Sequence, residues 1–214
     1  MRRPQFAAVV PVKPPAVGKS RMRGLTATER ARLASGFALD VVAACLATPA
    51  VARVLAVTDD AGFARELERA GCAVVPDGVA GDLNETLRLA AREAARRWPD
   101  LVPVAVCADL PALNPPDLAA ALDAWTGAPS FVADSDGVGT TLYVADAAAF
   151  APAFGHESRA AHRAAGVAEL PGRVLTLRRD VDDVAALDQA RRLGVGPHTS
   201  AAVAGIAVLA RPDG

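Results

Sequence analysis

Short apolar runs that alternate with longer helical patterns constrain the fold of this chain most. The apolar runs predict strands at residues 6–12, 51–58, 72–75, 102–107, 131–133, 140–144 and 174–177. Helical patterns fill most of the intervals, at residues 26–47, 59–70, 83–98, 115–125, 157–165 and 184–193. Because strands separated by helices usually pair in parallel, we expect an α/β fold. Its central sheet is predicted to be mostly parallel, with helices on both faces.

The domain organisation follows from the same rhythm. The chain has 214 residues, of which 52% are hydrophobic, which is enough for one buried core. No internal repeat and no linker divides it, so we expect a single domain over residues 1–193. Residues 194–214 have no clear period before the apolar run at 203–209. For this tail the sequence leaves two alternatives, a disordered segment and a late edge strand.

Composition excludes several classes of partner. The net charge is −1, without the basic patch of a protein that binds nucleic acid. No apolar run reaches the ~20 residues that span a bilayer, and the first residues do not form a secretory signal. The three cysteines, Cys45, Cys72 and Cys107, lie far apart without a metal-binding or redox spacing. We therefore expect a cytoplasmic protein with no membrane or nucleic-acid partner.

A cationic loop at residues 11–23 follows the first predicted strand. It contains both lysines of the chain, Lys13 and Lys19, together with Arg21 and Arg23. Ligands of open parallel sheets bind at the carboxyl ends of the strands, and Lys and Arg side chains suit phosphate groups. The loop is thus predicted to bind an anion such as a nucleotide triphosphate. The alternative is a solvated surface loop.

Two further features bear on nucleotide binding. Gly18, Lys19 and Ser20 resemble the end of a P-loop, but that motif requires glycine at position 13, where Lys13 stands. The motif therefore argues against a P-loop ATPase, and Ser20 stays with the predicted nucleotide loop. Asn84 lies at the start of a predicted helix, where it either reads the base or ribose or supports the helix cap.

Three aspartates are candidate magnesium ligands. Asp109 lies where a strand leaves the sheet, and a carboxylate there can hold Mg²⁺ against phosphates; the alternative is a cap for the following turn. Asp180 and Asp182, at spacing two, face the same side of an extended backbone. Their alternative role is to cap and complement the dipole of the last predicted helix, a role that we assign to Asp183.

Two glycine-containing segments are candidate anion sites. Residues 134–139 form a predicted turn whose glycines allow a close ligand approach, and the hydroxyls of Thr140 and Thr141 follow it. The alternative is a plain hairpin turn. Residues 154–158 open a predicted helix, whose free amides and Ser158 hydroxyl suit an anion, unless Ser158 only caps the helix. His156 alone does not indicate a catalytic base.

Taken in order, these motifs resemble a known family, the guanylyltransferases of coenzyme F420 biosynthesis that act on 2-phospho-L-lactate or phosphoenolpyruvate. The resemblance covers residues 6 to 193. It rests on Val10-Pro11-Val12-Lys13, Gly18-Lys19-Ser20-Arg21, Gly81-Asp82-Leu83-Asn84, Asp109-Leu110-Pro111, Gly139-Thr140-Thr141-Leu142 and Phe154-Gly155-His156-Glu157-Ser158. Each motif is weak by itself, whereas the ordered set is specific.

The resemblance implies a Rossmann-like nucleotidyltransferase fold and a defined reaction. GTP and a phosphorylated C3 acid would give a guanylylated diphosphate and pyrophosphate, with Mg²⁺ as the cofactor. Thr140, Gly155 and Ser158 would hold the acid, and Asp109, Asp180 and Asp182 would hold Mg²⁺. The nucleotide would contact Lys13, Lys19, Ser20, Arg21, Arg23 and Asn84, and the residues expected to act in catalysis are Lys13, Lys19, Arg21 and Asp109.

Two other functions remain as alternatives. A glycosyltransferase that uses a nucleotide sugar would bind its metal at Asp134-Ser135-Asp136, but its diphosphate donor hardly needs four cations on the first loop. A nucleotide-binding regulatory module would not need a second anion site around Thr140, Gly155 and Ser158. Release of pyrophosphate from GTP separates the predicted enzyme from both.

Overall fold

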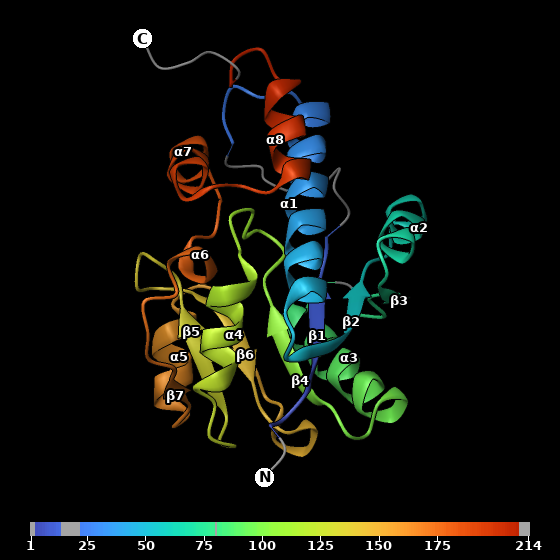
Figure 1. Cartoon of the computed structure of the whole chain (residues 1–214), viewed down its shortest axis with the longest axis vertical. Helices are drawn as coiled ribbons and strands as arrows, with labels where there is room; N and C mark the ends of the chain where they lie inside the picture. The colour runs from blue at the N-terminus through green and yellow to red at the C-terminus, as the bar shows by residue number, and fades with distance from the viewer. Residues whose placement is uncertain (1–2, 14–21, 80, 210–214) are drawn as a thin grey trace.

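The computed structural model describes residues 3–13, 22–79 and 81–209, which form an α/β fold (Figure 1). Within these residues seven strands make one sheet in the order β3-β2-β1-β4-β6-β5-β7. The strands are β1 (Phe6–Pro11), β2 (Val51–Val57), β3 (Ala73–Val75), β4 (Val102–Val106), β5 (Ser130–Ala133), β6 (Thr140–Val144) and β7 (Ala168–Glu169). The predicted fold class is confirmed.

One strand reverses the direction of the sheet. β1 pairs in parallel with β2 and β4, β2 with β3, and β5 with β7. β6 runs antiparallel to both of its neighbours, β4 and β5. The amino end of β6 therefore lies at the same edge of the sheet as the carboxyl ends of β1 and β4.

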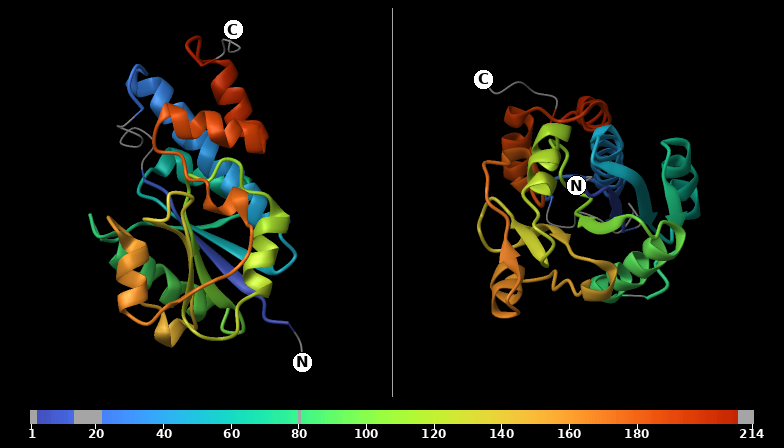
Figure 2. Two further views of the ribbon diagram at one scale, coloured as in Figure 1. Left: turned by 90° about the vertical axis from the view of Figure 1, so that its left-hand side faces the viewer. Right: turned by 60° about the horizontal axis from the view of Figure 1, so that its bottom comes forward.

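Helices cover both faces of the sheet (Figure 2). One face carries α1 (Ala27–Ala47), α2 (Ala61–Arg69), α4 (Pro115–Asp123) and α6 (Leu175–Arg178). The other carries α3 (Leu83–Arg97), η2 (Ala147–Ala149) and α5 (Ser158–Ala164). A capping box begins α1: the Thr26 side chain accepts from the Glu29 N–H, and the Glu29 carboxylate accepts from the Thr26 N–H.

Strand β1 shows how both faces are filled. Phe6, Ala8 and Val10 pack into the cluster under α1, α2 and α4, whereas Ala7 and Val9 pack against α3. Burial of every second residue on each side gives the continuous apolar run typical of a central parallel strand. Because such a strand has no polar face, its ligand-binding groups must come from the loop that follows it.

A third apolar cluster lies beyond the carboxyl edge of the sheet. There α8 (Pro197–Ala204) packs on the first half of α1, and α7 (Val184–Leu193) adds buried side chains to the same cluster (Figure 1). The buried members are Met22, Leu25, Leu33, Phe37, Ala112, Val181, Leu187, Ala190, Ala202, Val203, Ile206 and Leu209. The cluster joins the predicted tail to the segment that follows the cationic loop.

The tail is thus neither disordered nor an edge strand over residues 197–204. The buried carboxylate of Asp40 on α1 accepts the N–H groups of His198 (3.0 Å) and Thr199 (2.8 Å) in the first turn of α8. A Cβ atom on Gly196 would lie 2.3 Å from the Asp40 carboxyl carbon, so only glycine fits there. This cap comes from a residue 158 positions away in the sequence, and no local pattern announces it.

The strand predicted at residues 174–177 is wrong, because this segment forms α6. Val174 and Leu177, three positions apart, are buried, while Leu175 between them is exposed, which is a helical period. Thr176 donates its N–H and its hydroxyl to the Asp117 carboxylate of α4, at 2.8 and 2.7 Å. The alternation of apolar and polar residues resembled a strand, but packing on α4 favours the helical turn.

Two shorter findings complete the fold. The edge strand β7, only two residues long, was not predicted from the sequence. In the described ranges, no helix combines the length and the apolar character needed to cross a membrane.

Candidate active site

Two predicted site residues follow neighbouring strands that end at the carboxyl edge of the sheet. Lys13 follows β1, and Asp109 follows β4. Because Val9 of β1 pairs with Ala105 of β4, both site residues lie four positions beyond the same rung. Lys13 is exposed and Asp109 is partly buried.

The remaining cations of the loop divide into two groups. Arg23 is exposed and lies next to Met22, which is fully buried in the third cluster. Lys19, Ser20 and Arg21 lie outside the described residues, so their assignment to the nucleotide stays a prediction.

The predicted magnesium ligands lie on two segments that a backbone hydrogen bond joins. The Val181 N–H donates to the Asp109 carbonyl oxygen at 3.0 Å, and Val181 lies between Asp180 and Asp182. Burial, followed by the negative charges of Asp109, Asp134 and Asp182, raises the pKa of the Asp180 carboxyl to about 7. Such crowding of carboxylates is expected where a cation normally offsets their charge.

The chemistry of this donor set fits Mg²⁺ that arrives with a substrate. No group of three or more His, Cys, Asp or Glu side chains in the described part of the chain is already arranged to hold a metal ion. Mg²⁺ does not need such a group, because it is usually held by one or two carboxylates together with substrate phosphates and water. The roles of Asp109, Asp180 and Asp182 stay predictions. Asp183 caps α7 as predicted, accepting the Ala186 N–H at 2.8 Å.

The turn before β6 is closed by one of its own carboxylates. Asp134 accepts the N–H groups of Val138 (2.9 Å) and Gly139 (2.7 Å). A Cβ atom at position 139 would lie 2.5 Å from Asp134 Oδ2, so the turn requires glycine there. Asp136 is exposed and pairs with Arg179 at 3.5 Å. Asp134 is thus engaged in building the turn that places Thr140 at the start of β6.

The three residues predicted to hold the acid lie in one hydrogen-bond network. The hydroxyl of Thr140 lies 3.1 Å from Nδ1 of the buried His162 on α5. Ser158, the first residue of α5, is buried and donates its N–H to the Gly155 carbonyl oxygen at 3.3 Å. His162 Nε2 accepts the N–H of Ala153, two residues before Gly155. The structure therefore brings Thr140, Gly155 and Ser158 together around His162.

Sequence reasoning did not single out His162. A signal was present, because His162 lies four positions after Ser158 and therefore on the same face of α5.

Asn84 supports the loop that leads to Gly155. Its side-chain amide donates to the Phe154 carbonyl oxygen at 2.9 Å, and its Oδ1 accepts the Phe154 N–H at 2.7 Å. The cap of α3 is supplied by Asp82, which accepts the Glu85 N–H. Contact of Asn84 with a nucleotide stays a prediction, whereas its bracket around Phe154 is a contact that the sequence did not indicate.

The residues predicted to hold the phosphorylated acid lie on segments that are hydrogen-bonded to those of the aspartates. The Cys107 N–H donates to the Thr141 carbonyl oxygen at 2.9 Å, two residues before Asp109. The Ser135 N–H donates to the Arg178 carbonyl oxygen at 2.7 Å, two residues before Asp180. A phosphorylated acid near Thr140 would therefore lie beside the carboxylates.

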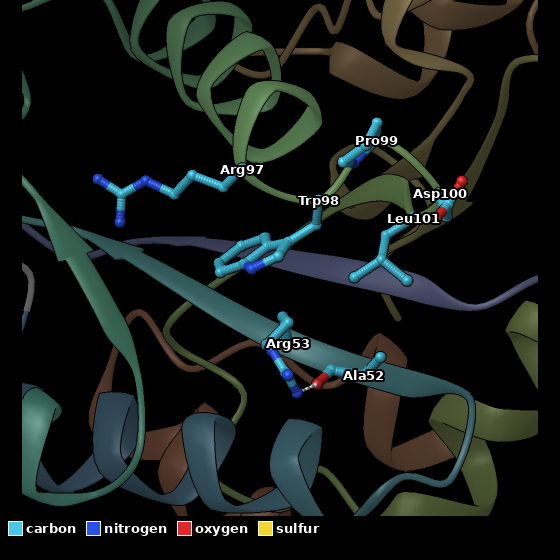
Figure 3. A pocket seen from close by; sticks show the side chains of 7 residues that line it. All are labelled: Ala52, Arg53, Arg97, Trp98, Pro99, Asp100 and Leu101. Atoms are coloured by element: carbon cyan, nitrogen blue, oxygen red, sulfur yellow. Dashed lines mark hydrogen bonds between the residues drawn. The ribbon is translucent and has the colours of Figure 1, made fainter.

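A cavity of about 330 Å³ lies elsewhere, near the amino ends of β2 and β4 (Figure 3). It is lined by Ala52, Arg53, Arg97, Trp98, Pro99, Asp100 and Leu101. None of the predicted site residues lines it, and it lies at the edge of the sheet opposite to Lys13 and Asp109. The candidate site is thus the carboxyl edge and not this cavity.

Residues 6–165 match the sequence model of a family described as "Guanylyl transferase CofC like". The chain belongs to this guanylyl transferase family. The matched segment includes Lys13, Asp109 and all three predicted acid residues. Asp180 and Asp182 lie beyond it.

Relatives of known name agree with the family. A phosphoenolpyruvate guanylyltransferase of Streptomyces coelicolor is 48% identical over 94% of this chain and 96% of its own length. One of Thermomonospora curvata is 48% identical over 93% of this chain and 89% of its own length. Among solved structures, a 4-diphosphocytidyl-2C-methyl-D-erythritol synthase is 15% identical over 89% of this chain and 99% of its own, with a TM-score of 0.59. That likeness supports the nucleotidyltransferase fold alone.

Proposed function

We propose that this guanylyl transferase moves GMP from GTP to phosphoenolpyruvate and releases pyrophosphate, as a step of coenzyme F420 biosynthesis. The observation that carries the proposal is the 48% identity to a phosphoenolpyruvate guanylyltransferase over nearly the full length of both chains. The geometry supports it, because Lys13, the carboxylates and the Thr140–Ser158 network lie at one edge of the sheet.

The nucleotide half of the proposed site lies on the loop after β1. Its cations, Lys13, Lys19, Arg21 and Arg23, would offset the charge of the triphosphate, because Lys acts as a point charge and Arg can donate two parallel hydrogen bonds. Ser20 and Asn84 are assigned to nucleotide contacts on the sequence resemblance. The register of β1 and β4 supports a phosphate held between Lys13 and Asp109.

The acid half is assigned to Thr140, Gly155 and Ser158. Phosphoenolpyruvate is preferred over 2-phospho-L-lactate because the Streptomyces coelicolor and Thermomonospora curvata relatives are named for phosphoenolpyruvate. Gly155 is exposed with φ +140°, a conformation that keeps its backbone open to a ligand and disfavours any larger residue.

The chemistry asks for positioning rather than for a strong base. An oxygen of the acid's phosphate would form a bond to the α-phosphorus of GTP, while the bond from that phosphorus to the oxygen bridging to the β-phosphate breaks and its electron pair leaves with pyrophosphate. The attacking phosphate is largely dianionic near neutral pH, since its second pKa is about 6. Orientation of two anions and neutralisation of their charge then supply most of the rate.

Mg²⁺ is proposed as the cofactor, held by Asp109, Asp180 and Asp182 together with substrate phosphates. When bound, it would supply positive charge that offsets the negative charge of the substrates' phosphate groups. The raised pKa of Asp180, which Asp109, Asp134 and Asp182 each increase, supports a cation at this place.

A glycosyltransferase that binds metal through Asp134 and Asp136 is less well supported. The Asp134 carboxylate already closes its turn through two backbone N–H groups, and Asp136 pairs with Arg179. A regulatory module is disfavoured by the second anion site. We place the enzyme in the cytoplasm, where its nucleotide substrate is made and where three free thiols at Cys45, Cys72 and Cys107 stay reduced.

The test is a substrate matrix. The protein is incubated with each ribonucleoside triphosphate and with phosphoenolpyruvate, 2-phospho-L-lactate or 3-phosphoglycerate, with and without Mg²⁺, and pyrophosphate is assayed. We expect release with GTP and phosphoenolpyruvate only when Mg²⁺ is present. The guanylylated product is identified by its mass.

Three outcomes would contradict the proposal. Pyrophosphate release without any acid, a stronger response to another acid, or GDP as the product would each assign a different reaction. Binding of GTP that is never consumed with any acid would favour the regulatory module.

A further inference from the structure

His162 lies at the centre of the acid region without facing solvent. Its relative exposure is 0%. Its ring stacks on Phe131 of β5 and on Tyr143 of β6, with centroids 5.0 and 5.2 Å away, and meets the edge of Phe154 at 5.9 Å. Aromatic contacts on three sides fix the plane of the imidazole, so its two nitrogens have defined partners.

These partners determine which nitrogen carries the proton. The Ala153 N–H donates to His162 Nε2 at 2.9 Å, so Nε2 must be an acceptor. Burial lowers the pKa of His162, opposed in part by a hydrogen bond to the Ser158 backbone carbonyl. A neutral ring whose Nε2 accepts carries its proton on Nδ1. That proton faces the Thr140 hydroxyl oxygen, which lies 3.1 Å from Nδ1, and the Ser158 carbonyl oxygen.

The tautomer then sets the direction of the Thr140 hydroxyl. Because Nδ1 donates, the oxygen of Thr140 accepts, and the hydroxyl's own proton must point to another partner. Thr140 is the first residue of β6 and is 7% exposed; it directly follows the turn that Asp134 closes. At the amino end of β6, the Thr140 hydroxyl is thus available as a hydrogen-bond donor, which suits a phosphate or carboxylate oxygen.

We propose that His162 is a positioning residue of the acid site: held as the neutral Nδ1–H tautomer, it orients the Thr140 hydroxyl as a donor towards the phosphorylated acid. The inference rests on the proposed function for the identity of that acid. His162 does not touch the substrate; it acts through Thr140, and its bonds to Ala153 and to the Ser158 carbonyl keep the segments that carry Gly155 and Ser158 beside it.

The first experiment reads the tautomer in the resting wild-type protein. Long-range ¹H–¹⁵N correlation spectra at mildly alkaline pH distinguish a protonated ring nitrogen from an unprotonated one. His156 and His198 are exposed and serve as references in the same spectrum. We expect His162 as Nδ1–H and the references mainly as Nε2–H, the form that free imidazole side chains favour. An Nε2–H tautomer at His162 would overturn the proposal, whatever substrate the enzyme uses.

The second experiment is a double-mutant cycle in the active enzyme. In His162→Gln, the side-chain amide oxygen can still accept the Ala153 N–H, but the fixed Nδ1–H donor to Thr140 is lost. We expect KM for phosphoenolpyruvate to rise about tenfold, as for one lost hydrogen bond to a charged group, while KM for GTP stays within about twofold. In a Thr140→Val background the same change is expected to add less than about twofold, because the hydroxyl that it positions is gone.

The results separate this inference from the proposed function. An equal factor in both backgrounds, or an equal rise in KM for GTP, would make His162 a purely structural residue. A wild-type protein that makes no pyrophosphate with any acid would refute the proposed function instead, and the tautomer would still be decided by the spectrum.

Discussion

At the scale of single residues, the candidate site brings four carboxylates close together. Asp180 lies close enough to Asp109, Asp134 and Asp182 for each to raise its pKa. Asp134 has two backbone N–H donors for compensation. On the proposed function, a polyanionic substrate would add to this charge, so both a bound cation and the loop that carries Lys13 would be needed to offset it.

Replacement of Asp109 tests this arrangement directly. Asp109→Asn is expected to lower kcat by about 10²–10³-fold, because a charge that supports the transition state is removed while the side-chain shape is kept. The melting temperature should change little. Steady-state pyrophosphate assays and thermal unfolding measure the two effects. The matched control is Asp100→Asn, an exposed carboxylate at the opposite edge, which should be silent; near-normal turnover of Asp109→Asn would remove Asp109 from the metal site.

The buried His162 also gives the protein a pH-dependent stability. Its pKa is lowered in the folded state, whereas the unfolded chain has the ordinary value near ~6.5. As pH falls through that value, the unfolded state takes up a proton that the folded state does not, so the free energy of unfolding decreases. His162→Gln lacks this contribution.

Urea unfolding of wild type and His162→Gln at neutral and at mildly acidic pH measures the difference. We expect the stability advantage of the wild type to shrink towards acid pH. An advantage that is constant across the range, or that grows in acid, would contradict a lowered pKa.

The candidate residues that could be predicted are those whose place follows from strand ends. Lys13 and Asp109 each follow an apolar run, so the rule for parallel sheets places them on one edge, and the β1–β4 register agrees. His162 could not be found this way, because Thr140 and Ala153, its hydrogen-bond partners, lie on other segments. The two hydrogen bonds between the Asn84 side chain and the Phe154 backbone join residues 70 positions apart, and they could not be predicted for the same reason.

At the scale of elements, local signals were reliable where an element carries its own cap. The ends of α1 and α7 agree with Thr26, Glu29 and Asp183, which act within three residues of their partners. The strand prediction for residues 174–177 was wrong because the conformation of this segment depends on Asp117 of α4. Helix α8 was missed because Asp40 caps it from a distant helix. Elements that borrow their polar partners from afar are the ones that sequence patterns do not reveal.

The cap on α8 gives a prediction at this scale. Asp40→Ala leaves the N–H groups of His198 and Thr199 without their acceptor in a buried place, so we expect the free energy of unfolding to fall by about 2 kcal/mol. Urea denaturation measures it. Asp100→Ala is the control, since it removes an exposed carboxylate. Its free energy of unfolding should stay within about 0.5 kcal/mol of the wild-type value. A loss at Asp40 no larger than this control would show that α8 does not depend on the cap.

At the scale of the whole molecule, the third apolar cluster links residues 202–209 to the carboxyl end of the cationic loop. Met22 and Leu25, which flank Arg23, are buried with Ile206 and Leu209. The residues that follow α8 therefore share a buried cluster with the segment where the cationic loop rejoins the fold. Stability and nucleotide affinity should be coupled through this cluster and not through the two clusters that cover the sheet.

Two matched core substitutions separate these cases. Ile206→Ala and Leu122→Ala each remove a fully buried side chain and should cost about 2–5 kcal/mol of unfolding free energy. Only Ile206→Ala is expected to weaken GTP binding, by about tenfold, because it loosens the anchor beside Arg23. Calorimetric titration at a temperature where both variants are folded measures this. Equal GTP affinity in the two variants would uncouple the cluster from the nucleotide.

The reversed strand β6 has a consequence for chimeric enzymes. Because β6 starts at the edge where β1 and β4 end, Thr140 lies at that edge although it follows α4 in the sequence. The residues proposed for the acceptor, Thr140, Gly155 and Ser158, all follow α4, whereas Lys13, Asn84 and Asp109, proposed for the donor nucleotide and its metal, precede it. On these assignments, a chimera joined within α4 is expected to take its acceptor choice from the relative that supplies the later stretch.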